Sequence, residues 1–336
     1  MTKLADDPMY IAKCKTYGSG VLLALVFGFL VSACQPGLLS GVGVDAQATS
    51  SGSASAGNSG VGAGGSGGVG PTHAGGTAGA GGITGEGGTL AQSTFVMVGA
   101  EGQIATTVDG ETIVEVQPKS GMARDDLRSV AFLGSQFIAV GGTAGVGVVR
   151  RSADGEQWLT LGVDPGAWIG DVARHVGGAD LLVAVGENGG RWYSTDWGTT
   201  LTASSTAPPA GHFFRVATND LLSVAVGESA GEGMTSVSSD GQTWSDAAVA
   251  GAPLRAVVYG AGVFVAVGSS GRCSVSTDGV SWTDFALSSD DYKHLAYVNG
   301  EFVIPGTQGE FRSTDGYTWA FVSPTPRRFF AYGAGI

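Results

Sequence analysis

The chain has 336 residues, a formal net charge of −12, 59 glycines and only 14% charged residues. Because phosphate binding needs concentrated Lys and Arg, this acidic balance argues against nucleic acid as a partner. The apolar and aromatic residues that a sizeable core requires are concentrated after residue 92. The composition therefore predicts one folded domain, residues 93–336, behind a long N-terminal extension.

The first 33 residues have the pattern of an export signal. Lysines precede an apolar run of eleven residues, 21–31, and small residues follow it. That run is shorter than the ~20 residues of a helix that spans a bilayer. Two aspartates near the start are unusual in such a signal, which leaves Met9 as an alternative start of translation. We expect residues 1–33 to be removed on export.

The end of this signal resembles the lipobox of bacterial lipoproteins. The segment Val31-Ser32-Ala33-Cys34 matches its four positions, and the resemblance implies that Cys34 becomes lipidated. The alternative is an ordinary cleavage site with an incidental cysteine. Gln35 rather than aspartate follows the cysteine, and resemblance to the enterobacterial sorting rule then implies an outer-membrane location in the cell envelope. Cys273 is the other cysteine of the mature chain, so an internal disulfide framework is not expected.

Residues 34–92 form a tract that begins with the lipidated cysteine. From residue 35 it contains no Lys, Arg or aromatic residue and consists mainly of Gly, Ser, Ala, Thr and Val. Such a tract cannot bury enough apolar surface to offset its ordering entropy, so we expect disorder. A Gly-rich coil of this length reaches ~40 Å, which is enough to hold a domain clear of a lipid surface. Its predicted function is spacing.

A short motif built on Asp-Gly recurs six times in the remaining chain, at intervals of 37 to 45 residues. In the fourth copy it is Ser239-Asp240-Gly241, and four of the six copies are followed by tryptophan at a fixed offset. A short apolar run that ends in glycine precedes each copy. The six aspartates are Asp109, Asp154, Asp196, Asp240, Asp278 and Asp315.

The repeated segment resembles the Asp-box (BNR) repeat, Ser-x-Asp-x-Gly-x-Thr-Trp, and the resemblance covers residues 93–336. In such a box a carboxylate accepts backbone N–H bonds across a tight turn, and glycine supplies a conformation that other residues avoid. The aromatic residue then packs between neighbouring sheets. We therefore interpret the six aspartates as structural, and not as catalytic acids or calcium ligands.

A second segment opens each repeat, so that every unit contains four short strands in about 40 residues. The fold class predicted is all-β, a six-bladed β-propeller. The opening segments are residues 127–132, 169–174, 213–218, 254–259, 292–297 and 327–332.

The two ends of the domain complement each other. The first Asp box has no opening strand before it, whereas residues 329–336 form an opening strand with nothing after it. Placed end to end, residues 331–336 and 94–99 reproduce the pattern of residues 258–268. We therefore expect the C-terminal strand to become the innermost strand of the first blade, which removes two exposed sheet edges.

Asp-box propellers include sialidases, so a sialidase-like glycoside hydrolase is the enzyme alternative. The resemblance would imply an arginine triad, an early Phe/Tyr-Arg-Ile-Pro motif and a Tyr–Glu pair, and these motifs are not present. No pair of carboxylates suited to acid–base catalysis is recognisable. His175, His212 and His294 lie in three different repeats and do not form a zinc motif. We expect that the protein is not an enzyme and that it binds no metal and no cofactor.

Basic residues recur near the start of the opening strands. The second position of these strands holds Arg128, Arg255, Lys293 and Arg328, and the third adds Arg215, Asp171 and His294. The first strand of a propeller blade lines the central channel, so these residues would form a partial cationic ring around one channel mouth. A positive mouth in an acidic protein attracts carboxylates. The alternative is that the cations are solvated, or paired with Asp171 and Asp126.

The same arrangement resembles the photosystem II assembly and stability factor family, on the blade pattern and on Arg128, Arg255 and Arg328. The resemblance implies that an arginine patch binds a protein partner. The function predicted is that of a lipid-anchored, extracytoplasmic binding or assembly propeller. We expect a monomer that contacts the membrane only through its lipid. Its ligand is expected to be a protein or a glycan, and an acidic ligand is favoured.

Overall fold

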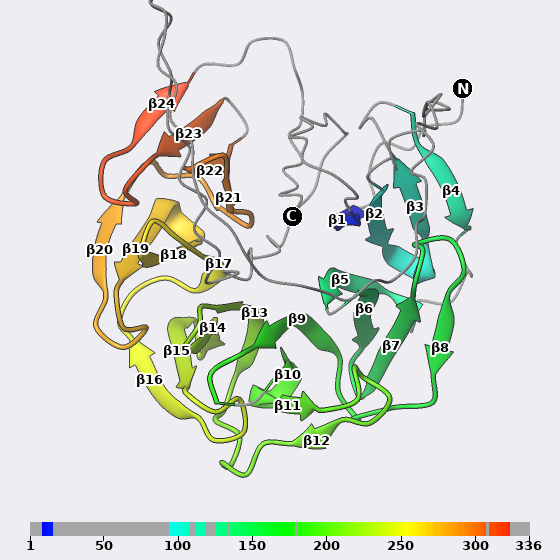
Figure 1. The fold of residues 1–336 in the computed structure, drawn as a ribbon. Helices are drawn as coiled ribbons and strands as arrows, with labels where there is room; N and C mark the ends of the chain where they lie inside the picture. The colour runs from blue at the N-terminus through cyan, green and yellow to red at the C-terminus, as the bar shows by residue number, and fades with distance from the viewer. Residues whose placement is uncertain are drawn as a thin grey trace, which may run out of the picture. The chain divides into compact units, whose positions relative to one another are not determined.

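The computed structural model describes residues 94–107, 112–118, 125–133, 135–178, 180–306 and 309–322, together with the backbone of residues 9–15. All of them belong to one compact unit, residues 1–37 and 90–336. Within this unit, six antiparallel sheets of four strands each follow one another around a common centre (Figure 1). The predicted fold class, an all-β, six-bladed β-propeller, is confirmed.

The strands of each blade run from the centre outwards in chain order, and successive inner strands contact one another from β1 to β21. The inner strands are β1 (Met9–Lys15), β5 (Leu127–Leu133), β9 (Ile169–His175), β13 (His212–Thr218), β17 (Leu254–Gly260) and β21 (Ala296–Val298). The second strands are β2 (Thr94–Gly99), β6 (Gln136–Thr143), β10 (Leu181–Gly186), β14 (Ser223–Ser229), β18 (Val263–Gly268) and β22 (Glu301–Pro305).

The third and outermost strands complete the blades. The third strands are β3 (Ile104–Thr107), β7 (Val146–Ser152), β11 (Arg191–Ser194), β15 (Glu232–Ser238), β19 (Arg272–Ser276) and β23 (Glu310–Ser313). The outermost strands are β4 (Val114–Gln117), β8 (Leu159–Leu161), β12 (Thr202–Ala203), β16 (Ser245–Val249), β20 (Thr283–Ala286) and β24 (Ala320–Val322). We number the blades one to six in this order.

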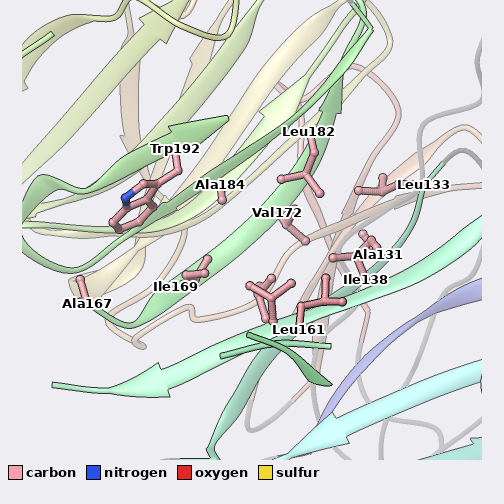
Figure 2. Packing of buried hydrophobic residues seen from close by; sticks show 12 residues of the cluster. Ala131, Leu133, Ile138, Leu161, Ala167, Ile169, Val172, Leu182, Ala184 and Trp192 are labelled. Carbon is pink, nitrogen blue, oxygen red and sulfur yellow. The ribbon is translucent and has the colours of Figure 1, made fainter. Parts of the chain in front are cut away.

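The hydrophobic core lies between blades and not inside them. Ile138 and Leu161 of the second blade pack with Ile169 and Leu182 of the third (Figure 2). Similar clusters join blades one and two, three and four, four and five, and five and six. Both faces of the second strands are therefore buried, which explains why these strands read as continuous apolar runs and do not alternate.

The repeated Asp-Gly motif forms the turn between the third and fourth strands. In the second blade, Asp154 Oδ1 accepts the N–H groups of Glu156 and Gln157 at 2.8 Å each. Gly155, at φ 84°, donates its N–H to Ser152 Oγ at 2.8 Å. The turns of Asp240, Asp278 and Asp315 have the same serine, aspartate and glycine contacts. In the longer turn of Asp196, Gly198 donates to Ser194 Oγ and Asp196 Oδ1 accepts the N–H of Thr200.

Two details of these motifs differ from the sequence pattern or lie outside the structure. In the fourth blade the serine of the motif is Ser238 and not Ser239, because Ser238 Oγ accepts the N–H of Gly241 at 2.8 Å. The first aspartate, Asp109, lies outside the described residues.

Burial opposes ionisation of Asp240, but hydrogen bonds from Thr243 and Gln242 outweigh it and lower its pKa to about 2.

Each described motif glycine also docks its blade on the preceding one. A Cβ on Gly279, whose φ is 73°, would lie 2.5 Å from a methyl group of Val224 on β14. The same contact with the second or third strand of the preceding blade recurs at Gly155, Gly198, Gly241 and Gly316. Glycine is therefore required both for the left-handed turn and for the close approach of two blades.

Closure of the first blade differs from the expectation. Residues 329–336 were expected beside β2, and they lie outside the described residues. In the structure, β1 pairs with β2, from Met9 opposite Gly99 to Lys15 opposite Thr94. An open sheet edge pairs through main-chain N–H and C=O groups, so more than one segment of the chain can satisfy it. The strand observed belongs to the predicted export signal.

The last blade also differs. Its opening strand was expected at residues 292–297, but β21 begins at Ala296. The N–H of Tyr292 instead donates to the carbonyl of Gly268 in the fifth blade at 3.0 Å. Pro305, at the end of β22, has no N–H with which to extend the ladder. Lys293 and His294 therefore precede the strand.

Three single-turn 3-10 helices connect second and third strands in alternate blades: η1 (Ala100–Gly102), η3 (Glu187–Gly189) and η4 (Ser269–Gly271). The N–H of Ser270 in η4 donates to Asp291 Oδ1 of the next blade at 2.8 Å, and similar bonds fix η1 and η3. These bonds fix the loops at the end of the ring where the inner strands begin. In the part of the chain that the structure describes, no helix is long and apolar enough to cross a membrane.

Candidate functional site

The starts of the inner strands surround a cavity of about 430 Å³, which we call the mouth cavity. It is formed by residues from the second to the sixth blade, at the end of the ring where the inner strands begin. Its lining consists of Arg128, Trp168, Gly170, Phe214, Arg215, Arg255, Ser269, Asp291, Lys293 and His294.

Most candidate residues identified from the sequence meet at this cavity. Arg128, Arg215, Arg255, Lys293 and His294 all contribute to the lining, although they lie on four different blades. Asp171 is not part of the lining, because it is buried among the inner strands. Arg328, the remaining candidate, lies outside the described residues.

The arginines are held by backbone and side-chain contacts. Arg128 Nε donates to the carbonyl of Gly142 at 3.1 Å. Arg215 donates to the carbonyls of Gly170 at 3.0 Å and Phe214 at 2.7 Å. Arg255 forms an ion pair of 2.9 Å with Glu228, and each of these two side chains is about 30% exposed. These contacts orient the guanidinium groups, and all three arginines remain part of the cavity lining.

The expected pairing partners of the cations have other contacts. Asp126 Oδ1 accepts the N–H of Glu101 at 2.8 Å, and so belongs to the bonds that fix η1. Asp171, on β9, is 1% exposed. It accepts hydrogen bonds from Ser129 Oγ on β5 at 2.5 Å and from the N–H of Val216 on β13 at 3.1 Å. Asp171 therefore bridges three successive inner strands and is not among the residues that line the cavity.

Two titrating groups near the cations are shifted toward their neutral forms. Burial raises the pKa of Asp171, although Arg215 and the bonds from Ser129 and Val216 oppose the shift. His294 is half-buried, with both ring nitrogens inaccessible to solvent. Its burial, with Arg215 and Lys293 nearby, lowers the pKa of His294 to about 3. The positive charge of the mouth at neutral pH therefore comes from arginine and lysine alone.

The site also contains an aromatic element that the repeat pattern does not predict. The rings of Trp168 and Phe214 stack with their planes at 11° and their centroids 6.2 Å apart. The Arg128 guanidinium lies over Trp168, 4.7 Å from its ring centroid, and that of Arg255 lies over Phe214 at 4.6 Å. We call these four side chains the stacked row. It fixes two of the arginines by cation–π contacts across four blades.

Gly170 explains how Trp168 reaches this position. It occupies the second position of β9, where β5 carries Arg128 and β17 carries Arg255. A Cβ at Gly170 would lie 3.0 Å from Trp168 Cζ3, and 2.9 Å from the carbonyl oxygens of Phe213 and Phe214. Glu187 Oε2 then accepts the N–H of Trp168 at 3.2 Å. A tryptophan two residues before a glycine at this position is the signal that would have identified it.

The chemistry of the mouth cavity suits anion binding. Four cationic side chains line it, and Asp291 is the single carboxylate in the lining that the structure describes. Glycoside hydrolysis uses two carboxyl groups that flank the scissile bond. Among the described residues there is no cluster of three or more His, Cys, Asp or Glu side chains that could hold a metal ion.

Comparison with known proteins finds likeness in fold. No family model matches the chain, and no curated protein matches its sequence. A solved structure of YCF48 bound to D1 peptide is 20% identical, with a TM-score of 0.52 over 68% of this chain and 76% of that chain. YCF48 from Cyanidioschyzon merolae is 17% identical, with a TM-score of 0.51 over 68% of this chain and 81% of that chain. The chain is thus a β-propeller similar in fold to YCF48.

Proposed function

We propose that this protein is a binding or assembly propeller that recognises an acidic segment of a protein ligand at the mouth cavity. The observation that carries the proposal is the convergence of Arg128, Arg215, Arg255 and Lys293 on one cavity, in a chain of net charge −12. A local positive potential against an acidic background attracts a carboxylate and orients it. Nothing in this function requires a chemical step or a cofactor.

The similarity in fold supports a protein ligand over a glycan. YCF48, whose fold this chain shares, has been solved with D1 peptide bound to it. The cavity also has the size of a small binding site, since ligand pockets are generally about 300–1,000 Å³ and this one is about 430 Å³. It would hold one or two side chains of a protein segment, with the rest of the ligand outside it.

Alanine substitution of the cations should abolish recognition. We expect the variant with Arg128→Ala, Arg255→Ala, Lys293→Ala and Arg328→Ala to stay folded and to lose a fluorescent oligoglutamate peptide in an anisotropy assay. A charge-assisted hydrogen bond contributes about 1.5–3 kcal/mol, so Arg128→Ala alone should weaken binding about tenfold or more. Arg174→Ala, which removes a cation paired with Asp180 outside the cavity, is the matched control. Equal binding by the native and fourfold variants would refute the proposed site.

We also propose that the propeller is held at the outer membrane by a lipid on Cys34. The support is the sequence Val31-Ser32-Ala33-Cys34 at the end of an export signal. Replacing Cys34 with serine removes the acceptor sulfur, so we expect Cys34→Ser to move the protein from the detergent-rich to the aqueous phase, or to leave it unprocessed. The native protein labelled with a radioactive fatty acid provides the control. Identical partitioning of the two proteins would contradict lipid anchoring.

A further inference from the structure

The mouth cavity has two kinds of wall. Arg128, Arg255 and Lys293 provide cationic groups from the second, fifth and sixth blades, whereas Trp168 and Phe214 provide stacked rings from the third and fourth. Both rings are half-buried and line the cavity. The ring faces are covered by Arg128, by Arg255 and by one another, so the rings offer their edges to the cavity. A ligand that carries only charge would leave these edges in contact with water.

At the start of the inner strand of the third blade, an aromatic ring lies where other blades have a cation. Gly170 leaves free the space that a side chain of the third blade would occupy, and the indole of Trp168 comes within contact distance of it. Glu187 holds the backbone of Trp168, and Trp168 also lies against His212, with ring centroids 5.7 Å apart. The ring is thus fixed in place before any ligand binds, which lowers the entropy cost of using it as a contact surface.

We infer that the mouth cavity selects a protein segment in which an aromatic side chain lies within one or two residues of a carboxylate. The carboxylate meets the cations, and the aromatic side chain packs against the edges of Trp168 and Phe214 in the cavity wall. This inference rests on the proposed function and specifies the ligand of the same site. Charge complementarity defines the acidic part, and the stacked row defines its aromatic neighbour.

The dimensions of the site set the spacing. Arg128 lies over Trp168 and Arg255 lies over Phe214 at less than 5 Å from the ring centroids, so each cation is immediately beside an aromatic surface. A volume of about 430 Å³ accommodates one ring and one carboxylate together. Successive residues of an extended segment are about 3.3 Å apart, so the two groups must be close in sequence to enter the same cavity.

Three short synthetic peptides test the inference. All have the same Gly/Ser-rich flanks; the first carries two glutamates followed by phenylalanine, the second replaces phenylalanine with alanine, and the third replaces both glutamates with glutamine. Each is titrated into the native protein and into Trp168→Leu, Trp168→Phe and the fourfold alanine variant by calorimetry. Melting curves of the variants identify any that do not fold, and Phe214→Leu substitutes for Trp168→Leu if that variant fails.

We expect the native protein to bind the acidic aromatic peptide about three- to tenfold more tightly than the acidic alanine peptide. Trp168→Leu should remove this preference while it still binds both acidic peptides, and Trp168→Phe should retain most of it. Equal affinity of the two acidic peptides for the native protein overturns the inference and leaves the proposed function intact. If neither acidic peptide binds the native protein better than the fourfold variant, both proposals fail. Binding of an oligogalacturonate in place of the peptides would assign the site to an acidic glycan.

Discussion

A protein that consists of residues 93–336 should unfold cooperatively, whereas one that ends at residue 328 should aggregate or lose its cooperative transition. The inner edge of β2 needs a partner strand, which β1 provides in the structure. Cleavage of the predicted export signal would remove β1. Residues 331–336 match the pattern of residues 258–263, of which residues 258–260 end β17 and pair with β18 in the fifth blade. Each lost hydrogen bond costs about 1 kcal/mol. Any transition that the truncated protein retains should therefore have a melting temperature lower by about 10 °C or more.

A synthetic peptide of residues 9–15 distinguishes the two possible closing strands. It is added to both proteins during thermal unfolding. If residues 329–336 close the ring, the peptide should have no effect on the longer protein and should partly restore the shorter one, because the edge of β2 is then open. If the longer protein melts as poorly as the shorter one and recovers with the peptide, β1 is the required strand. The C-terminal closure predicted from the repeats would then be wrong.

Asp171→Ala should destabilise the propeller by about 3–5 kcal/mol, because it leaves two buried hydrogen-bond donors without an acceptor. These donors are the hydroxyl of Ser129 and the N–H of Val216, on the inner strands before and after β9. Urea unfolding followed by tryptophan fluorescence measures the loss. Ser129→Ala is the matched control, since it removes one donor together with its bond and should cost only about 1 kcal/mol. A loss for Asp171→Ala no larger than that of the control would exclude a bridging function.

The same carboxyl group should make stability depend on pH in a defined direction. The folded protein raises the pKa of Asp171 above the value of 3.8 that applies to an unfolded chain. Its contribution is therefore fully present below about pH 3.8 and is lost as the pH rises through the folded pKa. The free energy of unfolding of the native protein, relative to Asp171→Asn, should decline over that interval. A difference that stays constant or grows with pH would contradict the raised pKa.

The fold could be predicted from the sequence because its determinants are local and repeated. Each motif such as Ser152 to Gly155 closes its own turn with bonds between residues two or three positions apart. The apolar run before each motif identifies a strand buried on both faces, and six copies in register leave few alternatives to a propeller. The closing strand was harder to assign, because an edge of main-chain groups accepts more than one segment of the chain.

The sequence by itself also indicated that Arg128, Arg255 and Lys293 lie at the same end of the ring, because equivalent positions of a repeat occupy similar places in successive blades. Only the tertiary structure decided what surrounds them. Trp168 precedes its strand and enters the site through space left by Gly170, a contact across blades that no repeat position encodes. Asp171 likewise shares the pattern of the candidate residues, but its bonds to two other blades remove it from the surface. A repeat fixes the place of a residue in its own blade, whereas its partners come from blades some 40 residues away.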